Sequence, residues 1–225
     1  MSDPNAPAPF AKRTYGGISG EERSRQRREK LLESSLDVFG TLGHDKATMR
    51  DICAHARLAE RYFYENFANI GEAFEAVYLT LSQQLFEALN QAVSQVPEDH
   101  AMGKASACLR AYFNFIKQDP RRAQIMLLDA PRLGHNNIHQ SGSTMAEYAR
   151  FMIGMVRGHQ GELPAKVDLD LVATGLIGLA AQTGITWYHS DFKASVDQLV
   201  EHNLYAWHGL AHWLDRQRSE QGQHA

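Results

Sequence analysis

Apolar residues recur at three- and four-residue spacing along most of the chain, which is the pattern of amphipathic helices. The first such stripe, ended by Gly43, contains Leu31, Leu32, Ser35, Leu36, Phe39 and Leu42. Further helices are predicted over residues 72–96, 101–118, 121–130, 144–158, 169–188 and 194–216, with Pro97 and Pro131 as stops and residues 134–143 as a polar loop. No run alternates with the period of two that is typical of a strand. The sequence therefore predicts an all-α protein.

Two short helices are expected after the first one. Thr48 and Asp51 have the spacing of a capping box, so a helix should begin at about Thr48. A second short helix is predicted over residues 60–67, with Phe63 and Phe67 on its apolar face. Two short helices joined by a tight turn form a helix-turn-helix candidate, in which the second helix enters the major groove of DNA.

Residues 32–78 resemble the DNA-binding domain of the TetR family of bacterial transcription regulators. The positions that carry the resemblance are Leu32, Ser35, Phe39, Gly43, Thr48, Met49, Arg50, Asp51, Ile52, the run Leu58-Ala59-Glu60-Arg61-Tyr62-Phe63-Tyr64, Asn66 and Phe67. The resemblance implies a three-helix head with a helix-turn-helix over residues 21–70. It also implies a larger helical body for effector binding and dimerisation over residues 71–218. Residues 1–20 are then an N-terminal arm that we expect to be disordered, and residues 219–225 a C-terminal tail.

The chain departs from the family pattern at three places. Arg57 stands in the turn where Gly is usual, so a residue with a side chain must adopt the turn conformation. Ala59 replaces the usual Ser or Thr cap of the recognition helix, which forfeits about 0.5–2 kcal/mol of capping. Ile70-Gly71 replaces the basic dipeptide that often opens the fourth helix.

The resemblance also implies roles for seven residues in DNA binding: Thr48, Arg50, Glu60, Arg61, Tyr62, Tyr64 and Asn66. Thr48 and Tyr64 match positions that contact phosphates, and the alternative for Tyr64 is packing within the domain. Glu60, Arg61 and Tyr62 would face base edges. Arg61 has the donor geometry for guanine and Glu60 can accept from cytosine.

Charge is distributed unevenly along the chain. Residues 12–30 carry seven cations and three anions, although the formal net charge of the 225-residue chain is −3. A basic front on an acidic body suits a small DNA-contacting end. The alternative is an Arg-rich helix face that is merely solvated.

Catalytic and metal-binding patterns are scarce. No Gly-rich phosphate loop or nucleophile elbow occurs, and Cys53 and Cys108 have no evident activating partner, so we expect neither an enzyme nor a cofactor. Two His pairs have helical i, i+4 spacing, namely His135 with His139 and His208 with His212. No further ligands accompany them, and we interpret them as surface or interface residues rather than a metal site. Two cysteines in apolar settings are consistent with a reducing cytoplasm.

Large aromatic and Met side chains recur within the predicted body. Those that we expect to line an apolar ligand pocket are Tyr112, Phe113, Met126, Tyr148, Phe151, Met152, Met155 and Trp187, with Gln182 as a polar contact. Plain hydrophobic core is the alternative for all of them. The resemblance favours a pocket, because the bodies of such regulators enclose apolar cavities.

The last two predicted helices carry more apolar surface than one subunit needs. Residues 169–188 approach the length of a membrane span, but Asp168 and Asp170 flank them and small residues allow close helix approach, so we reject that interpretation. We expect an intermolecular four-helix bundle formed by these helices. The candidate interface residues are Gly178, Ala181, Leu199, Trp207 and Leu210.

The function predicted from these features is that of a cytoplasmic, homodimeric, ligand-responsive transcription regulator. We expect a repressor that a hydrophobic small molecule releases from a pseudo-palindromic double-stranded DNA operator. One alternative is a helical binding or scaffold protein without DNA binding. Another is a ligand-independent activator of the same fold.

Overall fold

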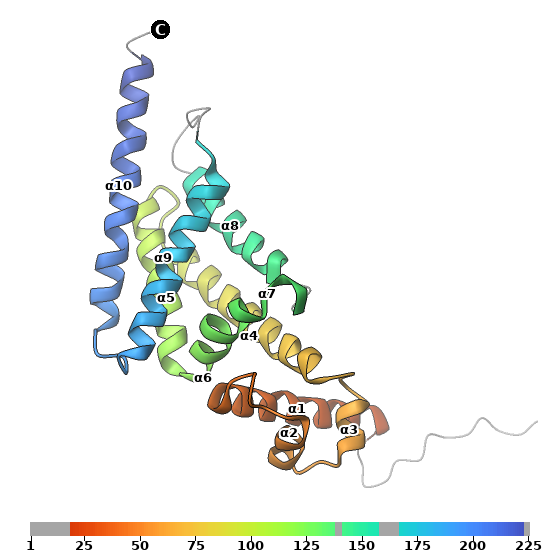
Figure 1. Cartoon of the computed structure of the whole chain (residues 1–225). Coiled ribbons are helices and arrows are strands. Elements are labelled where there is room, and N and C mark those ends of the chain that lie inside the picture. The colour runs from red at the N-terminus through yellow and green to blue at the C-terminus, as the bar shows by residue number, and fades with distance from the viewer. Residues whose placement is uncertain (1–18, 138–140, 158–166, 223–225) are drawn as a thin grey trace, which may run out of the picture.

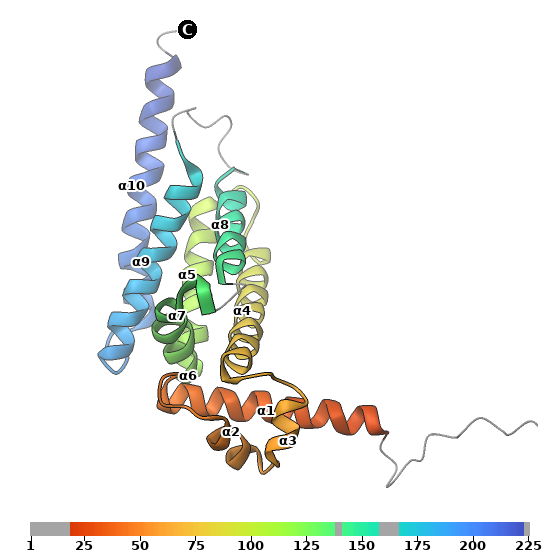
Figure 2. The same ribbon diagram turned by 45° about the vertical axis from the view of Figure 1, so that its right-hand side comes forward.

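The structure, a computed structural model, describes residues 19–137, 141–157 and 167–222. All regular structure in these ranges is helical, which confirms the all-α prediction. Figures 1 and 2 show three N-terminal helices as a head below an elongated body, with the C-terminal end of the last helix at the far end from the head. The predicted arm up to residue 18 and the end of the tail, residues 223–225, lie outside the described residues.

The head consists of α1 (Gly20–Leu42), α2 (Met49–Ala56) and α3 (Glu60–Tyr64). Gly43 ends α1 with a φ of 77°, a conformation that glycine adopts without strain. The capping box of α2 is present: the Asp51 amide donates to Thr48 Oγ1 (3.2 Å), and the Thr48 amide donates to the Asp51 carboxylate (2.9 Å). The recognition helix is shorter than predicted, because the chain turns after Tyr64 and packs Phe67 against Phe63 with ring centroids 5.4 Å apart.

Helix α4 (Ile70–Ser94) leads from the head into the body (Figure 1). It begins two residues before the predicted start, because the Asn69 side chain caps it by accepting from the Glu72 amide at 2.9 Å. Its buried face, Phe74, Val77, Tyr78, Leu81, Leu85 and Leu89, belongs to a core that also includes buried residues of the head. The core is therefore continuous from head to body.

The body continues with α5 (Ala101–Gln118), α6 (Arg121–Ala123), a π-helix η1 (Gln124–Asp129) and α7 (Ala130–Asn137). It is completed by α8 (Ser141–Arg157), α9 (Leu169–His189) and α10 (Val196–Gly222). A second core cluster joins α5, α9 and α10 through Leu109, Phe113, Trp187, Leu199, Val200 and Trp207.

Three boundaries of the body differ from the prediction. Pro131 does not end a helix. The π-helix bonds the Ala130 amide to the Ile125 carbonyl, so Pro131 falls in the first turn of α7, where a missing N–H costs nothing. The polar loop expected over residues 134–143 is helical in residues 134–137 and from Ser141 onward. Helix α10 extends to Gly222, so residues 219–222 belong to this helix rather than to a tail.

Candidate DNA-binding face, ligand cavity and the junction between them

The turn between α2 and α3 accommodates Arg57 in the left-handed conformation, with a φ of 53°. The Leu58 amide donates to the Cys53 carbonyl at 3.0 Å, and the Arg57 amide donates to the Ala54 carbonyl at 3.2 Å. Ala59 makes no side-chain cap, as its identity requires. Backbone hydrogen bonds thus hold the turn where neither Gly nor a capping hydroxyl is present.

Thr48 and Tyr64 lie at one hollow on the head. The hollow has a volume of about 380 Å³, and Met49, Asn69 and Ile70 also line it. The Tyr64 side chain is 60% exposed and its ring lies edge-on to Phe63. The two residues to which the resemblance assigns phosphate contacts therefore line the same hollow between α2, α3 and the start of α4.

Tyr62 lies between two arginine side chains. The Arg27 guanidinium of α1 lies 4.7 Å from its ring centroid and that of Arg61 lies 4.6 Å away. Arg61 also donates to the Tyr62 hydroxyl. Helix α1 thus positions a residue of the recognition helix, and Arg27, absent from the predicted set, adds a cation beside that helix. The basic run of residues 12–30 was the sequence signal that could have identified it.

Two other predicted residues are engaged within the head. The Asn66 side chain donates to the Tyr62 carbonyl at 2.7 Å, which satisfies an acceptor at the end of α3. Arg50 pairs with Glu60 at 3.4 Å, and both remain largely exposed. The Arg28 guanidinium lies 5.0 Å from the Phe67 ring centroid. Asn66 therefore holds the helix end, while Arg50 and Glu60 form one exposed pair across α2 and α3.

The body contains an apolar cavity of about 210 Å³ that is partly open to solvent. Five of the predicted pocket residues line it: Tyr112, Met126, Tyr148, Phe151 and Met152. Phe113 and Trp187 are instead buried in the second core cluster, with their rings edge-to-face at 5.9 Å. Gln182 is exposed, and the Met155 side chain lies outside the described residues. Tyr78, Leu85 and Leu89 of α4 also line the cavity, and their helical spacing was the available signal.

The polar groups of the cavity wall are held uncharged. Burial raises the pKa of the Tyr112 and Tyr148 hydroxyls and raises the pKa of the Cys108 thiol to about 12. The Tyr148 hydroxyl donates to the Ser82 carbonyl at 3.1 Å. The buried Tyr112 hydroxyl has no hydrogen-bond partner among the described residues. No Asp, Glu, Lys, Arg or His is among the described residues that line the cavity.

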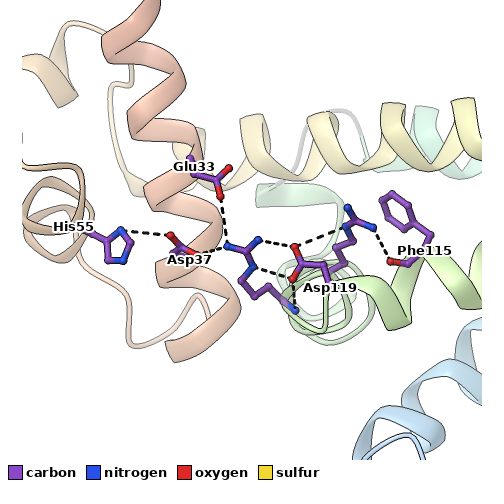
Figure 3. Close-up of polar contacts among 7 residues, drawn as sticks. Glu33, Asp37, His55, Phe115 and Asp119 are labelled. Carbon is purple, nitrogen blue, oxygen red and sulfur yellow. Dashed lines mark hydrogen bonds and ion pairs between the residues drawn. The ribbon is translucent and has the colours of Figure 1, made fainter.

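Arg121 of α6 connects the body to the head. Its guanidinium binds Asp119 at 2.7 and 2.8 Å and pairs with Asp37 of α1. His55 of α2 lies 3.5 Å from the other oxygen of Asp37. In Figure 3, the Asp37 carboxylate of the head and the Asp119 carboxylate of the body both face the guanidinium of Arg121. The hydrogen bonds from Arg121 lower the pKa of the Asp119 carboxyl.

The π-helix η1 contacts both the head and the cavity. Asp129, which is buried, accepts from the His44 amide of the head at 2.9 Å and from the Gln124 side chain at 3.0 Å. Met126 and Leu127 of the same helix line the cavity. A displacement of η1 by a bound molecule would therefore move an anchor of the loop between α1 and α2.

Known structures share this arrangement of helices. A TetR-like transcriptional regulator from Rhodococcus matches with a TM-score of 0.66 and 19% identity over 82% of this chain and 96% of that chain. The regulator FadR from Bacillus subtilis, solved with stearoyl-CoA, matches with a TM-score of 0.69 and 16% identity over 79% of this chain and 95% of that one. The fatty acid degradation regulator FadR from Bacillus halodurans has a TM-score of 0.67 and 15% identity, covering 80% and 94%.

The chain has a TetR-like fold. No family model and no curated protein matches its sequence. At 15–19% identity these structures establish the arrangement of helices and no more.

Helices α9 and α10, which lie side by side in Figures 1 and 2, each carry an exposed apolar line in this TetR-like fold. Leu171 and Leu179 of α9 are 70% and 40% exposed, and nothing lies within 4 Å of a Cβ added at Gly175 or Gly178. On α10, Tyr205 and Trp213 are 58% and 45% exposed.

Of the other residues assigned to a dimer interface, Leu199 and Trp207 are buried within the monomer. Ala181 lines the cavity and Leu210 is partly buried. Gly178 alone of the five lies on an open surface. On α10, packing against α5 directs Leu199 and Trp207 into the monomer core.

Helix α9 is the one described helix that is long and apolar enough to span a membrane, and only 11% of its apolar window is buried. Among the described residues, no group of three or more potential ligands could hold a metal ion. Of the paired histidines, His208 and His212 are exposed on α10, whereas the side chains of His135 and His139 lie outside the described set.

Proposed function

We propose that the protein is a homodimeric transcription regulator of the TetR family, a repressor that a hydrophobic small molecule releases from its operator. The observation that carries this proposal is the connection of two sites by one short segment. Residues 119–129 bind the head through Arg121 and Asp129 and form part of the cavity wall through Met126 and Leu127. A binding protein without DNA recognition would need no such connection to a helix-turn-helix.

Recognition of DNA would use α3 in the major groove. Arg61 is exposed and would read guanine, beside Glu60 and Tyr62 at the base edges. Thr48 and Tyr64 would contact phosphates from the hollow at the start of α2, with Arg50 close by and Asn66 holding the end of α3. Two such helices in a dimer would read half-sites separated by about one helical turn, roughly 34–36 Å, or a multiple of it.

Release would follow from differential affinity for two conformations. A molecule that fills the cavity contacts η1, and π-helical segments frequently occur at functional sites. If the filled cavity favours another position of η1, then the anchor of His44 on Asp129 moves and the head changes its orientation. Operator affinity then falls by the ligand's preference for that second state.

Dimerisation would bury the exposed lines on α9 and α10. Large exposed apolar side chains together with an open small-residue surface favour close helix contact between subunits. The same burial would account for the apolar character of α9 without a membrane span, which supports a cytoplasmic protein.

A ligand-independent activator of the same fold is the second candidate. The absence of a basic residue at Ile70-Gly71 leaves fewer phosphate contacts, which suits a regulator that needs help from another factor. A ligand that changes operator affinity would separate the two, because only the released repressor predicts weaker DNA binding.

The test is fluorescence-anisotropy titration of the purified protein with DNA upstream of its own gene, at several salt concentrations, beside a scrambled duplex. We expect saturable preference for the upstream DNA with two subunits per duplex. Equal, steeply salt-dependent binding to both duplexes would count against operator recognition.

Arg61→Ala provides the residue-level test. It should cost about 1–3 kcal/mol of operator affinity and relax the preference at one base step, because a guanine contact is lost. The matched control is Arg110→Ala, which removes an exposed arginine of the body that pairs with Asp197. Uniform weakening on all sequences, with a smaller salt slope, would instead assign Arg61 to a phosphate.

A further inference from the structure

Helix α3 is too short to hold itself in place. It has five residues, and Ala59 provides no side-chain cap. An isolated helix of this length does not form in water, because nucleation costs more than its few hydrogen bonds return. Phe63, which is fully buried, ties one side of α3 to the core of the head. A helix tied along one side can still rotate about its axis, so a contact on another side is needed to fix the direction of its exposed side chains.

Helix α1 supplies that second contact. The Arg27 guanidinium lies 4.7 Å from the ring centroid of Tyr62, the residue that precedes Phe63. Side chains of consecutive helical residues point about 100° apart, so Tyr62 and Phe63 hold α3 on two different sides. The buried Arg27 Nε atom has no hydrogen-bond partner among the described residues, which indicates a side chain held by packing on the ring rather than by an ion pair.

Arg28, the next residue of α1, contacts the chain just after α3. Its guanidinium lies 5.0 Å from the ring centroid of Phe67, and its Nη1 atom donates to the Asn66 carbonyl at 3.4 Å. Arg25 differs, because two carboxylates of its own helix bind its guanidinium at 2.7 Å each. Arg25 is thus neutralised within α1, whereas Arg27 and Arg28 reach the recognition helix and its end.

Tyr62 also contacts Arg61, the exposed arginine of the recognition helix. The Arg61 guanidinium lies 4.6 Å from the Tyr62 ring centroid and donates to the Tyr62 hydroxyl. An arginine whose guanidinium is already oriented loses less freedom when it binds a base. The Tyr62 ring therefore links α1 to the residue that would read guanine.

We propose that Arg27 is a positioning residue of the recognition helix: by stacking on Tyr62 it fixes the rotation of α3, and with it the place where Arg61 meets the bases. This inference rests on the proposed function for the role of Arg61. Arg27 acts through the ring rather than through its charge alone, because a planar guanidinium stacks on an aromatic face in a way that the ammonium of lysine does not. Its substitution should therefore reduce sequence preference rather than general affinity for DNA.

The test compares Arg27→Lys, which keeps the charge, with Arg25→Lys as the matched control on the same helix. Anisotropy titrations of the full-length protein give the ratio of dissociation constants for a scrambled duplex and for the DNA upstream of its own gene. We expect Arg27→Lys to lower this ratio about two- to fivefold, the range of one exposed cation–π contact, with an unchanged salt slope. Arg25→Lys should keep the ratio of the parent protein. A phosphate contact of Arg27 predicts an unchanged ratio in Arg27→Lys instead, since the charge remains.

A double-mutant cycle identifies the route. If Arg27 acts through the ring, then Arg27→Lys should have no further effect on the ratio once Tyr62→Leu has removed the ring. Tyr62→Phe, which retains the ring face, should preserve the effect of Arg27→Lys. Full additivity of Arg27→Lys and Tyr62→Leu would overturn the proposal, because Arg27 would then act independently of Tyr62. Thermal unfolding of each variant shows whether the fold is intact.

Amide hydrogen exchange without DNA reports separately on α3. The amides of Tyr62 and Glu65 donate to the carbonyls of Ala59 and Arg61 at 2.9 and 3.0 Å, so their exchange measures how firmly the helix is held. We expect exchange in residues 60–67 to be about two- to fivefold faster in Arg27→Lys than in the parent protein, and unchanged in Arg25→Lys.

The two readouts separate this inference from the proposed function. Faster exchange in Arg27→Lys, in a protein whose parent form binds both duplexes equally, would count against operator recognition and leave the contact between α1 and α3 standing. A parent protein that prefers the upstream duplex, with an unchanged ratio in Arg27→Lys, would overturn the role of Arg27 and leave the regulator standing. Unchanged exchange in Arg27→Lys would overturn the proposal in either case.

Discussion

The two sides of residues 119–131 differ in how they are packed. Toward the head, the contact is polar and close to the backbone. Arg121 binds Asp37 of α1 and Asp119, which directly follows α5, and a Cβ at Gly40 would stand 2.3 Å from the Arg121 Cβ. Toward the interior of the body, Met126 and Leu127 border empty apolar space. The side of the segment that faces the head is tightly packed, which we call the tight side, and the side that faces the cavity is loosely packed.

This difference indicates that the cavity side of residues 119–131 can adapt to a ligand, whereas the head side can pass a movement on to the helix-turn-helix. A cavity wall of thioethers and aliphatic groups can repack around ligands at small cost. Charged hydrogen bonds with defined geometry and a backbone-level contact cannot shift without breaking. A displacement of Met126 and Leu127 on the cavity side, which we call the soft side, would therefore move Arg121 and its carboxylate partners together and so reach the head.

The largest expected effect comes from Gly40→Ala, which acts on the tight side. The new Cβ would overlap the Arg121 Cβ and lie 2.9 Å from its Cα, so the backbones of α1 and α6 must separate. We expect a loss of about 2 kcal/mol of stability in urea unfolding, despite the better helix propensity of Ala. Gly154→Ala, where nothing lies within 4 Å, is the control and should be neutral or stabilising. Equal stability of the two variants would contradict the close contact.

Gly184→Ala acts on the soft side and should cost less. Its Cβ would lie 2.9 Å from the Tyr112 hydroxyl and 3.1 Å from a methyl of Leu127, both of which are side-chain ends that can move. We expect a loss of about 1 kcal/mol in stability, because the ring shifts into the cavity. Urea unfolding measures this loss, and a stability equal to that of the parent protein would mean that Tyr112 does not shift.

The smallest effect is a pH dependence at the junction. Arg121 lowers the pKa of Asp119 in the folded state, so the ionised carboxylate contributes stability that is complete above the unfolded pKa of about 3.9. This contribution is lost as the pH falls through the lower, folded pKa. Asp119→Asn should therefore be less stable than the parent protein at pH 7, and the difference should shrink below about pH 4. Urea unfolding at pH 7, 5 and 3 measures it, and a constant difference would show that Arg121 does not act through charge.

Local sequence determined the elements of the head. Thr48 and Asp51 specify the start of α2, Gly43 ends α1, and apolar periodicity locates the long helices to within a few residues, because these signals act within one or two turns. The residues around the helix-turn-helix were sufficient to predict a TetR-like fold. The aromatic and Met positions identified five residues of the cavity wall, because side chains of this size are buried wherever the helices meet.

Only the tertiary structure decided which buried side chains border empty space. Phe113 and Trp187 are large aromatic residues, as Tyr112 and Phe151 are, but their side chains fill the core between α5, α9 and α10. Trp207, which we expect at a dimer interface, is buried in the monomer and lines the cavity. The approach of Gly40 to Arg121 joins residues far apart in the chain. These outcomes depend on helix rotation and on long-range packing, which helical periodicity within one segment does not encode.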